Sequence, residues 1–244
     1  MTGQSATPFK GQVSEELVRQ LVFATNAEVQ EEFKRQHGEM IERAIKGIKA
    51  AHDSLDLLRY RLKNKGDLQV AIIELFFHAA INSVLCATHF LISGYPIPAG
   101  NMMRQYTEAV AMALLCLDGA SRVLERFTSD MTRFPVHEAP SMLRNKKRSE
   151  ALKRLIDFNP DSWEKALGLK ELYDSLSHAS GLSLAHASAL GTEHGMILGG
   201  EYDHDKDEKG AYAKDLRRYA TGAESLAQLI DVTSTALVKM KNKP

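Results

Sequence analysis

Four polar residues share one face of a predicted apolar helix, and they are the first candidates for chemistry. The segment 68–92 is otherwise apolar, and at 100° per residue its polar members fall within about 80° of one another. They are Glu74, His78, Asn82 and His89. A buried polar group without a hydrogen-bond partner costs about 1–3 kcal/mol. If this helix lies in the core, a second polar surface must therefore face the stripe.

An arginine and a glutamate one helical turn apart are the predicted partners of this stripe. Arg104 and Glu108 have the (i, i+4) spacing of helix neighbours, and folding the chain about Pro96 and Ile97 places Arg104 level with His89. We therefore expect Arg104, Glu108 and His89 to form one buried polar cluster. Such a cluster is either an ion pair that fixes helix register or the floor of a pocket for an anion or an amide.

A second group of candidates lies just before Gly181. Tyr173, Ser177 and His178 are at the predicted C-terminal end of another helix. A histidine there can simply contact the helix dipole, or it can serve as a base. We expect Arg104 and His178 to border the same cavity, so that a ligand, if the protein takes one, binds between them.

Motifs for metals, phosphates and nucleophiles are missing from the sequence. His178, His186 and His194 match no metal-ligand spacing, and the paired Glu-x-x-His motifs of a di-iron bundle are absent. The acidic run 203–208 lacks the glycine and the final glutamate of a calcium loop, which predicts a solvated turn. P-loop, G-x-S-x-G and dinucleotide motifs are also absent. The sequence predicts no metal and no cofactor, and it favours binding over catalysis.

The composition is that of a folded protein, and its balanced charge gives no strong long-range electrostatic field. The chain has 244 residues, 31 basic and 31 acidic, and is 44% hydrophobic. A net charge of zero gives no long-range attraction for nucleic acid or for an anionic membrane. Cys86 and Cys116 lie in apolar runs without a partner at metal-ligand spacing, which predicts reduced core thiols. The N-terminal sequence lacks the pattern of a secretion signal, so we expect a cytoplasmic protein.

Two segments raise specific alternatives. The segment 68–92 is long enough to cross a membrane, but its ionisable residues favour a central buried helix, and we expect no membrane contact. The run Arg144–Arg154 places six cations beside an apolar helix face, without aromatic residues for base stacking. This pattern is typical of a solvated face, and it is the one place where nucleic acid or an acidic partner could dock.

Helical periodicity dominates the elements that must position these residues. Apolar residues step by three and four over 38–64, 67–92, 101–128 and 211–241, and a shorter helix is predicted over 141–158. Residues 1–13 are predicted to be a loose tail, and 14–244 a single helical domain. The glycine-rich stretch 191–205 interrupts the helices and could hold a short hairpin. The predicted fold is an all-α bundle of long antiparallel helices with shorter helices crossing it.

Three motifs resemble a group of uncharacterised bacterial all-helical proteins of the HEPN-like class. They are Arg104-x-x-x-Glu108, the run Tyr173-x-x-Leu176-Ser177-His178, and Ile197-Leu198-Gly199-Gly200, which together span about residues 70–205. The resemblance implies an all-helical fold. The spacing of Arg133 and His137 differs from that of the ribonuclease-active members, so their activity is not predicted.

Three functions stay open at this point. The first is an intracellular, non-catalytic module that binds a small anion, a protein partner or a second copy of itself through a pocket of Arg104, Glu108 and His89. The second is a HEPN-like hydrolase acting on RNA or another phosphoester, with His178 or His89 as the base and Arg104 holding the anion. The third is a structural protein whose polar cluster only fixes helix register.

Overall fold

The protein has an all-α fold, as predicted. A computed structural model describes residues 26–63, 67–119, 122–156 and 202–242, and the backbone of 191–192 and 195–196. Its helices are α2 (Ala27–Leu62), α3 (Leu68–Ile92), α4 (Pro96–Leu117), α5 (Val123–Ser129), the 3-10 turn η2 (Val136–Glu138), α6 (Ala139–Met142), α7 (Lys146–Ile156), α10 (His204–Glu208) and α11 (Ala211–Lys241). The strands β1 (Gly191–Thr192) and β2 (Gly195–Met196) form a minimal antiparallel pair in the glycine-rich stretch.

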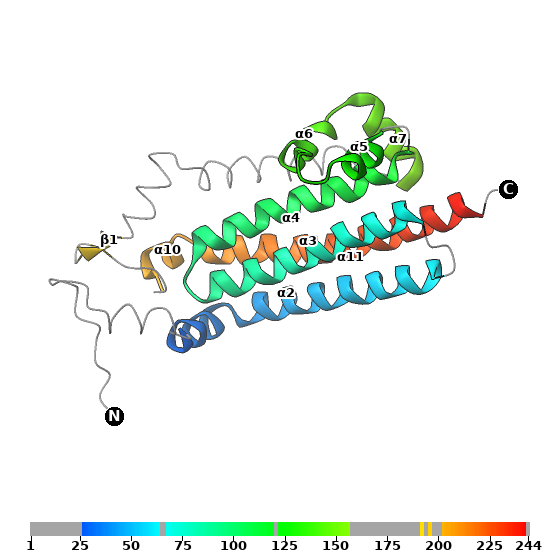
Figure 1. Ribbon diagram of the computed structural model, residues 1–244. Coiled ribbons are helices and arrows are strands. Elements are labelled where there is room, and N and C mark those ends of the chain that lie inside the picture. Colours follow the sequence, from blue (N-terminus) through cyan, green and yellow to red (C-terminus); the bar gives the residue numbers. More distant parts are fainter. Residues whose placement is uncertain are drawn as a thin grey trace.

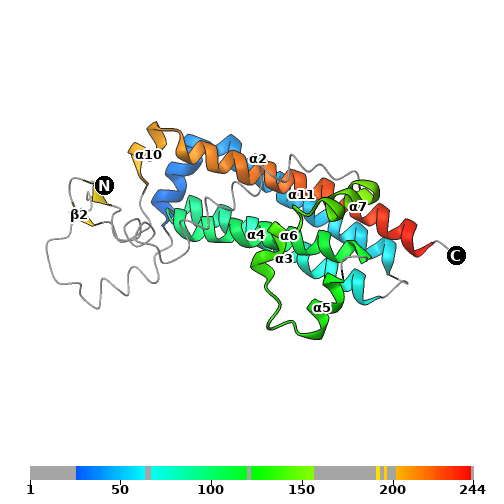
Figure 2. The same cartoon turned by 90° about the horizontal axis from the view of Figure 1, so that it is seen from above.

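The four long helices form two layers, one of α2 with α11 and one of α3 with α4 (Figures 1 and 2). Contacts between α2 and α11 follow the same order along both helices, from Arg43 with Glu224 to Arg61 with Ser234. Helices α2 and α11 are therefore parallel, and α3 alone runs against the other three. The chain returns to the starting end of the bundle between α4 and α11, and α5 to α7 pack over α4 and α11 on this path.

Close backbone contact joins α2 to α11. A Cβ atom built on Gly47 would lie 3.0 Å from the Cβ of Ala223 and 3.1 Å from the backbone nitrogen of Glu224. Only glycine allows this approach without displacement of a neighbour. Beside it, the Arg43 guanidinium donates to both carboxylate oxygens of Glu224, at 2.7 and 2.6 Å. The Glu224 carboxylate therefore forms a bidentate ion pair with Arg43 beside the close backbone contact.

Several predicted helix boundaries are wrong, and the helix predicted over 101–128 is divided into α4 and α5. α4 begins at Pro96 and not at residue 101, because a proline in the first turn needs no amide hydrogen bond and its fixed φ suits a helix. α2 begins at Ala27 and not at residue 38, and continues across a non-helical residue at His37. The helix predicted over 141–158 is divided into α6 and α7, where the side chain of Asn145 accepts from the amide of Lys147.

α3 is the most apolar of the described helices. Among them, it alone has the length and composition of a membrane span, and more than half of its most apolar stretch is buried in the protein. The carboxylate of Asp67 caps its first turn by accepting from the amides of Gln69 and Val70, and Lys241 of α11 donates to the same side chain. Burial alone would raise the pKa of Asp67, but these hydrogen bonds outweigh it and leave the pKa below 3.8.

Replacement of Asp67 by alanine is expected to cost about 1 kcal/mol of unfolding free energy at neutral pH, because the helix loses its N-cap and Lys241 loses its partner. The pKa of Asp67 is lower in the folded state, so its charged form stabilises the protein fully above the unfolded value of 3.8. This contribution disappears as the pH falls through the folded pKa. Melting curves of parent and variant from pH 7 to pH 2.5 should converge in acid, and a gap independent of pH would contradict the assignment.

Candidate functional site

The predicted arginine–glutamate pair forms, but without the predicted histidine. Arg104 and Glu108 lie on α4 with Nη1 and Oε1 3.6 Å apart, and both side chains are largely buried. His89 is exposed, and its ring lies beside that of Phe90. The prediction of one buried cluster is therefore wrong for His89. It shares a helix face with Asn82, two turns earlier, and this face of α3 points to solvent.

The polar stripe on α3 meets α2 instead of the α3–α4 hairpin. Glu74 Oε2 lies 3.7 Å from Nε of Arg59, and the rings of His78 and His52 meet edge-on with centroids 6.3 Å apart. Asn82 lies one turn further along and its amide is 3.2 Å from Nδ1 of His78. Burial raises the pKa of Glu74, and the charge of Arg59 only partly offsets this effect. The partners that the stripe requires are thus present, on a helix that the hairpin argument did not consider.

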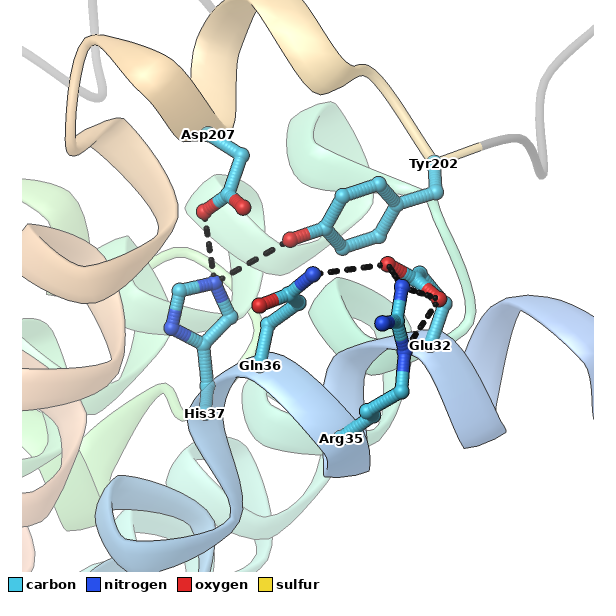
Figure 3. Close-up of polar contacts among 6 residues, drawn as sticks. All are labelled: Glu32, Arg35, Gln36, His37, Tyr202 and Asp207. Atoms are coloured by element: carbon cyan, nitrogen blue, oxygen red, sulfur yellow. Dashed lines mark hydrogen bonds and ion pairs between the residues drawn. The ribbon is translucent and has the colours of Figure 1, made fainter.

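A histidine, an aspartate and a tyrosine meet where α2 bends, and sequence reasoning missed this group (Figure 3). His37 Nε2 lies 2.7 Å from Oδ1 of Asp207 and 3.3 Å from the hydroxyl of Tyr202. The His37 and Asp207 side chains are only 10% and 20% exposed. His37 is also the non-helical residue of α2, with φ −131° and ψ 19°. We call this group the His37 cluster.

The His37 cluster has the geometry of a structural contact that holds α2 to α10 and α11. The Nε2 atom of His37 faces the carboxylate of Asp207, which accepts the hydrogen bond between them. Burial, together with Asp207, raises the pKa of Tyr202 and keeps its phenol protonated. Phe33 packs against Tyr202 and Tyr212 at centroid distances of 4.8 and 4.7 Å. The first turns of α2 are therefore held to α10 and α11 by a polar contact above an aromatic one.

Two features in the sequence bear on this cluster. Gly38 follows His37 inside an amphipathic pattern, and such a glycine weakens a helix locally. The acidic run 203–208 is predicted to be a solvated turn, which is wrong. Asp203 caps α10 by accepting from the amide of Lys206, and this turn of helix places Asp207 toward His37. No local sequence pattern indicates which residue Asp207 contacts.

Replacement of Asp207 by alanine is expected to lower the unfolding free energy by about 1–3 kcal/mol, because a largely buried imidazole loses its charged acceptor. The matched control is Asp205→Ala, which removes an exposed carboxylate from the same short helix and should change stability by less than about 0.5 kcal/mol. Urea unfolding measures both variants, and equal effects would show that His37 gains nothing specific from Asp207.

Three exposed apolar side chains lie where α2 and α3 run side by side. Leu75 and Leu85 of α3 are 55% and 45% exposed, and Ile45 of α2 is 50% exposed. Because His52 lies opposite His78 on antiparallel helices, Ile45, two turns from His52, is level with Leu85. Together with the exposed Asn82 and His89, these residues make up a surface that we call the α2–α3 face.

At one end of this face there is a shallow depression. Its volume is about 570 Å³, and it is bordered by the end of α2 and the beginning of α3. The charged side chains around it have both signs and are Arg59, Lys63, Asp67 and Glu74. This mixture gives no preference for an anion or a cation, so the depression is not an ion-binding site by charge.

The basic helix α7 turns its cations to solvent. Leu152 and Ile156 are buried, whereas Lys146, Lys147 and Arg154 are exposed. The apolar side therefore packs on the bundle, as the sequence pattern predicts. These exposed cations do not form a defined binding site for an anion.

Several predicted site residues lie outside the residues that the structure describes. They are Tyr173, Ser177 and His178, and with them the predicted cavity between Arg104 and His178, as well as the tail 1–13. Within the described ranges, no group of three or more His, Cys, Asp or Glu residues could hold a metal ion.

Comparison with known proteins adds no function. No family model, no curated protein and no solved structure matches the chain. The resemblance to HEPN-like proteins therefore stays a prediction from its motifs, and the function must be argued from the fold and from the α2–α3 face.

Proposed function

We propose that this chain is an intracellular, non-catalytic helical module that binds a protein through the α2–α3 face. The observation that carries the proposal is the character of α3. A helix of 25 residues that is apolar nearly all round belongs in a core, yet α3 leaves Leu68, Leu75 and Leu85 largely exposed. Exposed apolar side chains that recur along one side of a helix are typical of an interaction site.

The described polar groups support binding more than catalysis. His37 has its Nε2 hydrogen-bonded to Asp207, and His78 has its Nδ1 beside the Asn82 amide. Arg59 is shared between Asp56 and Glu74. The contacts of His37 with Asp207 and of Arg59 with Glu74 join different helices, which is what a rigid binding scaffold requires. Cys86 and Cys116 are free thiols, as is usual in a reducing compartment.

The test is the size of the protein's complex in the cells it comes from. The tagged full chain, released gently and separated by native size, should migrate well above its own mass of 27.1 kDa. The double variant Leu75→Lys with Leu85→Lys should migrate at the monomer mass, because each lysine would place a charge inside the contact. Leu57→Lys is the control, since Leu57 is 40% exposed and lies about 140° around α2 from His52, which contacts α3.

Two results would overturn the proposal. One is a parent protein that migrates as a monomer. The other is a double variant that keeps the parent's complex. Circular dichroism of the purified variants should show unchanged helix content, because both substituted side chains are already exposed.

A further inference from the structure

The exposed row of α3 carries no ionic charge. Its exposed positions are Leu68, Ala71, Leu75, Asn82, Leu85 and His89. The exposed positions of α2 and α11 differ, because lysine, arginine, aspartate or glutamate recurs along both helices, as at Lys49 and Asp53 of α2 and Arg217 and Asp231 of α11. A surface helix in water usually has a charged outer side. The exposed row of α3 thus has the composition of a contact surface.

From this row we infer that the α2–α3 face binds a second copy of this chain, so that the protein is a twofold homodimer. The inference rests on the proposed function and names its partner. A twofold interface places the same surface on both sides, so its residues must suit copies of themselves. Leucine packs on leucine, and the side-chain amide of Asn82 offers both a donor and an acceptor.

Charge complementarity favours a second copy over other partners. A basic or acidic partner would gain no ion pair from an uncharged row, and it would have to desolvate its own charges against leucine. The charges of α2 beside the row have both signs and include two ion pairs, Lys49 with Asp53 and Arg59 with Asp56. Such neutral pairs form a polar rim that two copies can share.

The size of the face agrees with a dimer of moderate strength. From Leu68 to His89 the row spans about 31 Å at 1.5 Å per residue, and α3 with the adjacent edge of α2 is about 20 Å wide. The face therefore covers about 600 Å² on each copy. Two copies would bury about 1,200 Å², which is the lower end of the range for specific interfaces. Dissociation on dilution is the expected behaviour.

The experiment is sedimentation of the purified full chain over a wide concentration range. The parent should pass from 27.1 kDa to twice that mass as concentration rises, and Leu57→Lys should do the same. The variant Leu75→Lys with Leu85→Lys should stay monomeric, as should Asn82→Lys, a second exposed substitution on the row. A mixture of this double lysine variant with Leu75→Glu, Leu85→Glu should recover a dimer, because opposite charges then meet across the axis.

Other outcomes would overturn the inference. A parent that is monomeric at every concentration would do so, as would a double lysine variant that dimerises like the parent. Flotation of a monomeric parent with anionic or neutral vesicles would assign the face to a membrane. If the purified parent is monomeric while its cellular complex still depends on Leu75 and Leu85, the second copy is excluded and the proposed function stands.

Discussion

Replacement of Gly47 by leucine is expected to lower the free energy of unfolding by about 3 kcal/mol, one of the two largest effects that we predict. The position faces backbone on α11, since a Cβ there would lie 3.1 Å from the amide nitrogen of Glu224 and 3.4 Å from the carbonyl oxygen of Ala220. A backbone cannot move aside as a flexible side chain can. A leucine side chain must therefore separate α2 from α11, and overpacking of this kind costs about 1–3 kcal/mol or more.

A second glycine of the same helix provides the control. Nothing lies within 4 Å of a Cβ built on Gly38, so Gly38→Ala should raise the unfolding free energy by about 0.5–1 kcal/mol through helix propensity alone. Gly47→Ala gains the same propensity, yet must displace Ala223, and it should be destabilising overall. Urea unfolding of the three variants measures the effects. Stabilisation by Gly47→Ala comparable to that by Gly38→Ala would show that the two helices are further apart than described.

Replacement of Phe33 by alanine is expected to cost about 3–5 kcal/mol, because a fully buried aromatic ring is removed and a cavity remains. The ring packs against Tyr202 and Tyr212, so the loss also removes the apolar half of the contact that holds the start of α2 to α10. Tyr60→Ala is the control. It removes an aromatic ring from the same helix, but Tyr60 is 79% exposed, and the change should stay within about 0.5 kcal/mol.

Hydrogen exchange shows where the stability is lost. In Phe33→Ala, amides in 27–36 should lose protection more than those around Gly47, because the segment before His37 depends on this aromatic contact. Uniform loss along α2 would show that the bend at His37 does not separate two parts of the helix. A change as small as that of Tyr60→Ala would show that Phe33 is not buried.

Local sequence patterns were sufficient to predict the secondary structure of the long helices. The periodicity of apolar residues predicts α3 and α11 almost to the residue, because amphipathic spacing belongs to the helix itself. The same reasoning predicts the buried and exposed sides of α7. Boundaries were less secure where a proline could begin a helix as well as end one, as at Pro96.

The neighbours of each helix were decided by tertiary structure. The demand that Glu74 and His78 have polar partners followed from the sequence, but the partners are Arg59 and His52 of α2, and His89 faces solvent. A hairpin argument considers only helices adjacent in sequence, whereas a bundle also packs each helix against elements that the chain reaches later.

The contact between His37 and Asp207 shows most clearly what local sequence patterns cannot predict. The two residues are 170 positions apart, and each occupies a segment whose local pattern indicates little beyond helix or turn. They meet because the chain crosses back after α4 and lays α11 parallel to α2, which brings α10 to the bend in α2. The sequence by itself determined an all-α chain with one long apolar helix that carries a polar stripe. The tertiary structure alone decided which groups that chain brings together, since helical periodicity acts over a few residues and packing acts over the whole chain.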